Sequence, residues 1–491
     1  MSLWWDFPKN GLTHCSSYLS ISPMEEYLLD PDFGFQRIKR LMAAGAEWCE
    51  VLVEDVTTWR LLCDDRKTNV SNASRLGVSV YAVASGKSFH SCCDGTAPES
   101  IDRITDAVCA SLRREGGGDR STSIGPFKVD SEPVQDVVEP LNSVDLSRKL
   151  EAVRAADSAG REAHENVHQL TVMYQDYTRR ALTLTSEGRI VQDDRSMLEL
   201  VARAFLRVNG ELLAASDMFG ALSGFEVLKE KEKGPEDLAR EAVRKAAVLI
   251  DSKPSPEGQM PVVFAPGSPG VLFHEACGHS FEADFIQKRS SFAGKMGKQV
   301  ASKLVTLVDS GRVFGSGGSL RFDDQGNPSQ KTILIEKGIL ANYMYDMRTA
   351  MVDGVKSTGN GRCESYEHPP IPRMTNTYVE NGADDPGAIL ADTKNGIYIK
   401  SIARGGNVDV LSGNFVVGVG EGYAIEDGKL TFPLKNATIS GSGPDVLMNI
   451  DAVGSDLEIH AGGRCGKGQS VPTGSGLPTL RVRTMVVGGG R

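Results

Sequence analysis

The sequence predicts an α+β protein, in which an N-terminal mixed α/β region precedes a β-rich, mostly antiparallel C-terminal domain that carries an HExxxH helix. Helical and strand periodicities alternate as far as residue 251. Residues 252–258, with their prolines, serines and glycine, form the clearest linker in the chain. Beyond this linker, glycines and short apolar strands dominate, and these features together predict the two-part organisation.

The first elements follow from apolar spacing. Residues 33–44 and 100–114 have the period of amphipathic helices, and residues 49–54 and 77–83 alternate as strands do. Residues 119–142 are rich in Ser, Pro and Asp and lack apolar periodicity. We therefore expect a connector near 119–142 inside the first domain.

The elements after the connector repeat this alternation. Helices are expected at residues 144–160 and 235–250, and the period-2 stretches 170–174 and 198–204 between them suggest a β-meander. The C-terminal strands are short runs separated by turn signals, at residues 332–336, 396–399 and 415–419.

These elements give three predicted units. They are an N-terminal arm of unassigned role at 1–28, an N-terminal α/β domain at 29–251 and the C-terminal β-rich domain at 252–491.

Composition narrows the class of function. The formal net charge is -10, and basic residues do not interleave with aromatics, so we expect no nucleic-acid partner. No apolar run approaches the length of a membrane span, and the N-terminus lacks the pattern of a signal peptide, so a cytoplasmic location without membrane contact is expected. The odd count of 9 cysteines fits a reducing compartment.

The run from His274 to His279 is the most informative stretch, because it places two imidazoles and the Glu275 carboxylate on one short segment. These groups are the minimum for a zinc-activated water, so the run indicates a metallopeptidase. The histidines are five residues apart, which in a regular α-helix would separate them by roughly 140°. Both can reach one ion if the helix widens into a π-type turn or breaks before His279, and Gly278 lies where that distortion is needed.

A catalytic zinc needs a third protein ligand. Cys465 is a candidate because it lies in a glycine-flanked loop between Arg464 and Lys467, two cations that would favour a thiolate. From the residues alone, Glu282 and His368 stay open as alternatives. Cys277, inside the motif, is expected to face the core.

Several segments together resemble the TldD branch of the TldD/PmbA metallopeptidase family. They are residues 274–285, 357–366, 372–377 and 465–479, and the likeness is strong from about residue 260 to the end. The resemblance implies that His274, His279 and Cys465 bind zinc and that Glu275 is the general base. It also implies a homodimer or a heterodimer with a PmbA-like chain. Substrate is expected to lie extended beside a strand, and residues 404–410, with Gly405 and Gly406, are a reasonable place for such pairing.

The predicted function is a zinc-dependent peptidase that hydrolyses peptide bonds in extended or unfolded peptides, using a metal-bound water and Glu275 as general base. Arg362, Tyr366 and His368 are candidate substrate-binding donors for the tetrahedral intermediate, although such a polar loop more often holds itself together. The alternative function is a metal-containing peptide-binding or maturation subunit without proteolytic activity. A structural metal would have a fourth protein ligand, most plausibly Cys277 or His368.

Overall fold

The computed structural model describes residues 27–116, 128–130, 137–230 and 234–489. Most of the predicted arm at 1–28 and most of the connector at 119–142 therefore lie outside the described residues. Two described pieces of the connector region have secondary structure, the strand β4 (Lys128–Asp130) and the 3₁₀ helix η1 (Leu141–Ser143).

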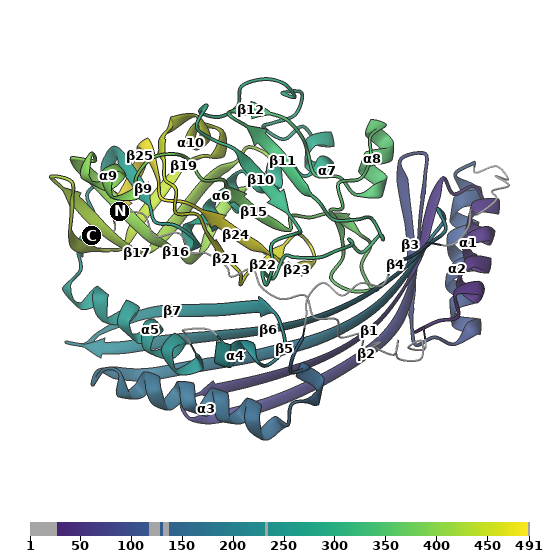
Figure 1. Ribbon diagram of the computed structural model, residues 1–491, viewed down its shortest axis with the longest axis horizontal. Coiled ribbons are helices and arrows are strands. Elements are labelled where there is room, and N and C mark those ends of the chain that lie inside the picture. Colours follow the sequence, from purple (N-terminus) through teal and green to yellow (C-terminus); the bar gives the residue numbers. More distant parts are fainter. Residues whose placement is uncertain (1–26, 117–127, 131–136, 231–233, 490–491) are drawn as a thin grey trace, which may run out of the picture.

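The N-terminal half is built on one long, curved sheet (Figure 1). Its strand order is β3-β2-β1-β5-β6-β4, with β7 also paired to β6, and all pairs are antiparallel except β4–β6. The strands are β1 (Trp48–Asp64), β2 (Lys67–Ala84), β3 (Lys87–Asp94), β5 (Val167–Thr185), β6 (Arg189–Val208) and β7 (Glu211–Leu222). Tight hairpins join β1 to β2, β2 to β3, β5 to β6 and β6 to β7. One is the Asn209-Gly210 turn, where both residues have positive φ, as a type I′ turn requires.

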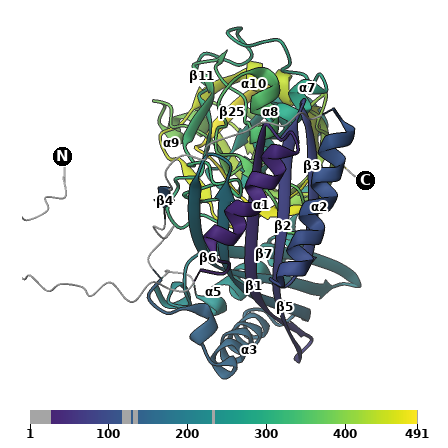
Figure 2. The same ribbon diagram turned by 90° about the vertical axis from the view of Figure 1, so that its right-hand side faces the viewer.

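Two pairs of helices cover one face of this sheet. α1 (Pro31–Ala43) and α2 (Pro98–Arg114) lie side by side over β1 and β2 (Figure 2). α3 (Leu146–Glu162) and α5 (Pro235–Val248) pack at the other end of the sheet, on β1, β5 and β6. α4 (Val227–Glu230) and η2 (Leu249–Asp251) complete this half. The helices predicted at 33–44, 100–114, 144–160 and 235–250 are confirmed to within a few residues.

The C-terminal half lies against the opposite, concave face of the sheet (Figure 1). Five strands close into a barrel in the order β16-β9-β25-β19-β17, with β17 returning to β16. They are β9 (Gly258–Phe264), β16 (Asn395–Asp409), β17 (Asn414–Glu426), β19 (Ala437–Ser442) and β25 (Leu480–Gly489). β8 (Lys253–Pro254), β18 (Lys429–Lys435) and β20 (Ile450–Val453) extend it. The predicted linker 252–258 thus contains β8.

A second sheet flanks the barrel, in the order β12-β11-β10-β15-β24-β21. Its strands are β10 (Leu307–Ser310), β11 (Lys331–Glu336), β12 (Ile339–Leu340), β15 (Asn376–Val379), β21 (Glu458–His460) and β24 (Gly474–Leu477). Two short ladders lie beside it, β13 (Gly361–Arg362) with β14 (Ile371–Pro372) and β22 (Arg464–Gly466) with β23 (Ser470–Pro472).

Short helices join these strands. They are η3 (Ser268–Gly270), α6 (Val271–Ala276), η4 (Gly278–Phe281), α7 (Ala283–Gln287), α8 (Met347–Asp353), α9 (Pro386–Ala391) and α10 (Gly443–Asn449). Most ladders in this half are antiparallel, with parallel pairs at β9–β16, β15–β24 and β8–β18. The predicted α+β class, with a β-rich C-terminal part, is confirmed. The domain bounds at 29, 252 and 491 stay a prediction.

Candidate metal centre

The histidine motif lies where the barrel strand β9 ends and the chain turns inward. η3 follows β9 and leads into α6, whose last turn carries His274 and Glu275. The helix then stops, because Cys277 leaves helical geometry at φ -122° and ψ -53°. A separate 3₁₀ turn, η4, presents His279, so the motif does not lie on one continuous helix. Of the two predicted ways to bring the histidines together, the structure contains the break and not a π-type turn, and the ring centroids are 5.2 Å apart.

Cys277 and Gly278, the two residues at the helix break, pack differently. A Cβ on Gly278 would lie 2.2 Å from Sδ of the buried Met374, so this position has no room for a side chain. Cys277 belongs to the hydrophobic core cluster of the C-terminal half and is 1% exposed. The expectation that Cys277 faces the core is confirmed.

Cys465 reaches the histidines from the distant β22–β23 hairpin. Its Sγ lies 3.2 Å from Nε2 of His279. One ligand atom from each of His274, His279 and Cys465 falls within 4.8 Å of the others, and all three residues are buried. Among the residues that the structure describes, no other histidine, cysteine, aspartate or glutamate joins this group, and Glu282 and His368, the open alternatives, are not in it.

The charges of the three groups depend on one another. Burial by itself would raise the pKa of the Cys465 thiol, but the His274 and His279 imidazoles beside it lower that pKa to about 5. Burial opposes protonation of both histidines, yet the neighbouring thiolate raises the pKa of His274, and Glu282 with the thiolate raises that of His279. The largest influences that favour the thiolate are thus the two imidazoles and not the neighbouring cations from which the sequence predicts it. Lys467 instead binds Glu282 and Asp284. A thiolate and two imidazoles, buried and convergent, fit the donor set of a zinc-type ion.

Glu275 lies at the open side of this group. Its carboxylate Oε2 is 3.8 Å from Nε2 of His279, and its side chain is 40% exposed whereas that of His279 is 3% exposed. The motif glutamate can therefore meet both the ligand group and a molecule arriving from solvent.

Two charged residues behind the candidate ligands support the site in ways that the sequence does not predict, although Glu282 is an alternative third ligand in the sequence analysis. Glu282 is buried and accepts a hydrogen bond at Oε2 from Nδ1 of His279, at 3.0 Å. Burial opposes its ionisation, but Lys467 and His279 lower the pKa of Glu282 to about 2. Arg373 is fully buried and donates to the carbonyl oxygens of Cys465 and Gln469. These hydrogen bonds hold the β22–β23 hairpin in place. The sequence shows only that these residues are charged and lie near the motifs, and it gives no signal of their partners.

The three predicted donors from the polar loop are engaged in the fold. Arg362 is buried and donates to the carbonyl oxygens of Met374 at 2.6 Å and Pro472 at 2.8 Å. Tyr366 packs against Gly77 of β2 and donates its hydroxyl hydrogen to Asp94 of β3. His368 is half-buried, with Nδ1 3.2 Å from Oγ of Ser365. These contacts support a structural role for all three residues.

Gly405 and Gly406 lie in β16, next to a bulge in its pairing with β17. Gly406 has φ 148°, which favours glycine. The side-chain surroundings of residues 404–405 lie outside the described residues.

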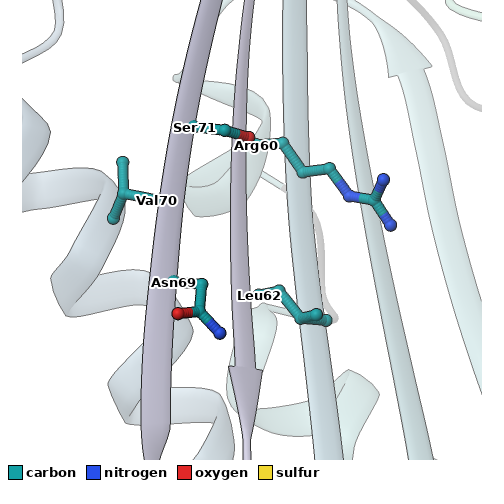
Figure 3. Close-up of a pocket in the computed structure, with 5 residues that line it drawn as sticks. All are labelled: Arg60, Leu62, Asn69, Val70 and Ser71. Carbon is teal, nitrogen blue, oxygen red and sulfur yellow. The ribbon is translucent and has the colours of Figure 1, made fainter.

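A shallow pocket on the N-terminal sheet does not belong to this centre. It is lined by Arg60, Leu62, Asn69, Val70 and Ser71 of the β1–β2 hairpin. Figure 3 shows Arg60 and Val70 pointing away from each other, so these side chains do not converge on a ligand.

The sequence matches two family profiles, described as the PmbA/TldA metallopeptidase central domain over residues 139–250 and the PmbA/TldA metallopeptidase C-terminal domain over residues 257–489. A metalloprotease TldD homolog of Haemophilus influenzae is 39% identical over 422 residues, which are 84% of this chain and 86% of that protein. A metalloprotease of Methanocaldococcus jannaschii is 37% identical over 341 residues, 69% of this chain and 74% of that protein.

Solved structures share the fold at lower identity. A protein from Thermotoga maritima described as a putative modulator of a DNA gyrase has a TM-score of 0.75 and 21% identity, over 93% of this chain and 99% of that one. TldE from Thermococcus kodakarensis has a TM-score of 0.72 and 18% identity, over 93% of this chain and 100% of that one. In the part of the chain that the structure describes, no helix is both long and apolar enough to cross a membrane. By its sequence matches, the chain belongs to the PmbA/TldD metallopeptidase family.

Proposed function

We propose that the protein is a zinc-dependent peptidase that hydrolyses peptide bonds in extended or unfolded peptides, with Glu275 as general base. One observation carries this proposal. His274, His279 and Cys465 converge in a buried group, and the half-exposed carboxylate of Glu275 lies at its open side. Three protein ligands beside a free carboxylate are the arrangement of a catalytic metal site.

The residues divide the work as follows. His274, His279 and Cys465 would hold the ion, which when bound supplies Lewis-acid activation of water and of the peptide carbonyl. Glu275 accepts the proton from the attacking water and returns it to the departing amine. Its exposure lets the carboxylate reach substrate, whereas the buried ligands stay fixed.

The alternative of a metal-containing binding or maturation subunit needs a closed metal site. Cys277 points into the core, and His368 interacts with Ser365, so neither candidate for a fourth ligand joins the three in the described part of the chain. The ligand count therefore favours catalysis.

Part of one edge of β16 is not paired with another described strand, and this supports the expectation that a peptide binds there. β9 pairs with β16 only at Ile397–Ile399, and no described strand pairs with that edge from Lys400 to Asp409. The same segment leads to Val410, whose carbonyl accepts a hydrogen bond from Oγ of Ser280, next to His279, at 2.6 Å. A peptide hydrogen-bonded to this edge, beside Gly405 and Gly406, would be held through its main chain with little side-chain preference. A homodimer, or a heterodimer with a PmbA-like chain, stays a prediction.

The test separates metal binding from proton transfer in a single variant. Glu275→Gln is expected to keep about one zinc per chain and to lose hydrolysis of an unfolded peptide by roughly 10²–10⁴-fold. Metal content is measured by atomic emission, and cleavage by mass spectrometry of the products. The exposed Glu426→Gln serves as the matched control and should behave as wild type.

Two results would contradict the proposal. Zinc loss in Glu275→Gln would make this residue a ligand, and full hydrolysis would remove it from the mechanism. Zinc-loaded wild type that binds peptides without cleaving them would favour the maturation subunit. A second variant, Cys465→Ala, is expected to lower zinc content, and full metal with full activity would remove Cys465 from the ligand set.

A further inference from the structure

Lys467 connects the two segments that supply the ligands. It lies two residues after Cys465, in the turn between β22 and β23, and its side chain is only 10% exposed. Its ammonium Nζ donates to Glu282 Oε2 at 2.8 Å, to Asp284 Oδ1 at 2.6 Å and to the carbonyl oxygen of Pro372 at 3.0 Å. An ammonium has three hydrogens to donate, so these contacts use all of them.

Glu282, which Lys467 holds, contacts His279, one of the proposed metal ligands. It is the N-cap residue of α7, yet its side chain makes no capping hydrogen bond. Its carboxylate instead turns toward His279, with Oε2 3.0 Å from Nδ1, while Oε1 accepts from the backbone nitrogen of Met374 at 3.3 Å. A proton held on Nδ1 leaves the lone pair of Nε2 free, and Nε2 is the atom that lies 3.2 Å from Sγ of Cys465.

We propose that Lys467 and Glu282 are positioning residues that assemble the metal centre. Glu282 fixes the tautomer and orientation of His279, and Lys467 holds Glu282 while bringing the Cys465 hairpin against it. The two proposed ligand segments are 186 residues apart in the chain, and the contacts of Lys467 join the β22–β23 hairpin to the residue that orients His279. This inference rests on the proposed function, because it assumes that His274, His279 and Cys465 bind an ion.

The experiment measures the metal site directly. Zinc affinity is determined by competition with a chromophoric chelator, and ligand geometry by the absorption spectrum of the Co²⁺-substituted protein. Lys467→Met is expected to weaken zinc binding by about 10–100-fold and to change the thiolate-to-cobalt band. Lys467→Arg keeps a cation that can donate to Glu282 and should restore most of the affinity. The control is Lys245→Met, which removes a partly buried lysine that pairs with Asp217 in the N-terminal half.

Glu282→Gln is the second variant, because removing the cation beside two carboxylates can destabilise the fold. It keeps an acceptor for His279 but loses the charge that holds Lys467, so weaker zinc binding is again expected. The double variant should lose less than the sum of the two single losses, since both act on one linkage.

Two outcomes would overturn the positioning role, and a third would overturn the proposed function instead. Wild-type zinc affinity and an unchanged cobalt spectrum in a folded Lys467→Met or Glu282→Gln variant would overturn the positioning role. A loss of thermal stability with an unaltered spectrum would do the same, because it indicates a merely structural ion pair. If wild type itself binds no zinc, the proposed function fails before this inference is reached.

Discussion

At the scale of single residues, the five-residue spacing of the histidines is resolved by a helix break and not by a distorted helix. Cys277 ends α6, and the following 3₁₀ turn restarts the chain in a new direction. Gly278 lets the buried side chain of Met374 pack directly against the chain at this break, because a glycine has no Cβ. The backbone of Met374 in turn hydrogen-bonds to Glu282 and Arg362.

Gly278→Ala tests this close approach. A Cβ placed 2.2 Å from Sδ of Met374 forces a buried thioether to move, an overpacking that costs about 1–3 kcal/mol. We expect a lower free energy of unfolding, measured by chemical denaturation, together with weaker zinc binding. Adding Met374→Ala should recover part of the zinc affinity by making room. No recovery would show that the glycine is needed for its backbone and not for space.

At the scale of elements, the β22–β23 hairpin is held in place by hydrogen bonds from two buried arginines. Arg373 donates to two carbonyl oxygens of the hairpin, those of Cys465 and Gln469, and Arg362 donates to the carbonyl of Pro472. Each of these guanidinium groups is almost completely buried. The position of Cys465 thus depends on hydrogen bonds to its own backbone from another segment.

Arg373→Met is expected to loosen this hairpin. The change removes two hydrogen bonds from a charged donor to the hairpin, at roughly 1.5–3 kcal/mol each, although it also removes a buried charge. The Gln469 carbonyl keeps the hydrogen bond that it accepts from the backbone nitrogen of Lys467. Hydrogen exchange of amides in residues 464–472 should become faster, and zinc content should fall. Arg481→Met, which removes an arginine paired with Asp451 on β20, is the control and should leave the hairpin unchanged. Unaltered exchange in Arg373→Met would mean that Arg373 does not hold the hairpin in place.

At the scale of the whole molecule, charged groups lie in the seam, by which we mean the interface between the concave face of the N-terminal sheet and the C-terminal half. Arg179 and Arg195, on β5 and β6, pair with Asp324 of the C-terminal half at 3.1 and 3.3 Å. Glu50 of β1 lies in the same seam, completely buried, and neither of its carboxylate oxygens has a hydrogen-bond partner among the described residues. Burial, reinforced by Asp323, Asp324 and Asp346, raises the pKa of Glu50 well above its usual range.

Glu50→Gln tests the contribution of this carboxyl group to stability. Because its pKa in the fold is raised, its stabilising contribution is complete below the ordinary value of 4.5 and is lost as the pH rises toward the raised value. We expect the denaturation midpoint of wild type to fall relative to that of Glu50→Gln as the pH rises above the ordinary value of 4.5. Parallel pH profiles for the two proteins would show that the carboxyl is not buried in the folded state.

The sequence by itself determined the local features. Periodicity located the main helices, and the spacing of His274, Glu275 and His279 identified the segment that we propose to bind a metal. The length of β2 was underestimated, since residues 67–76 are mostly polar and largely exposed on both faces, so no alternation marks them. The role of Cys465 came from a family resemblance, because a lone cysteine in a glycine-rich loop carries no signal of what it will face.

Tertiary structure decided everything that depends on which distant segments meet. Only the fold places Cys465 beside His279. It also brings Lys467 into hydrogen-bond contact with Glu282 and not with the thiolate, and it places Arg362 where it donates to main-chain carbonyls. The physical reason is that local periodicity reports how a segment buries its own apolar side. A buried polar group, in contrast, takes its partner from whichever segment the folded chain brings within hydrogen-bond distance, and neighbouring residues do not determine that choice.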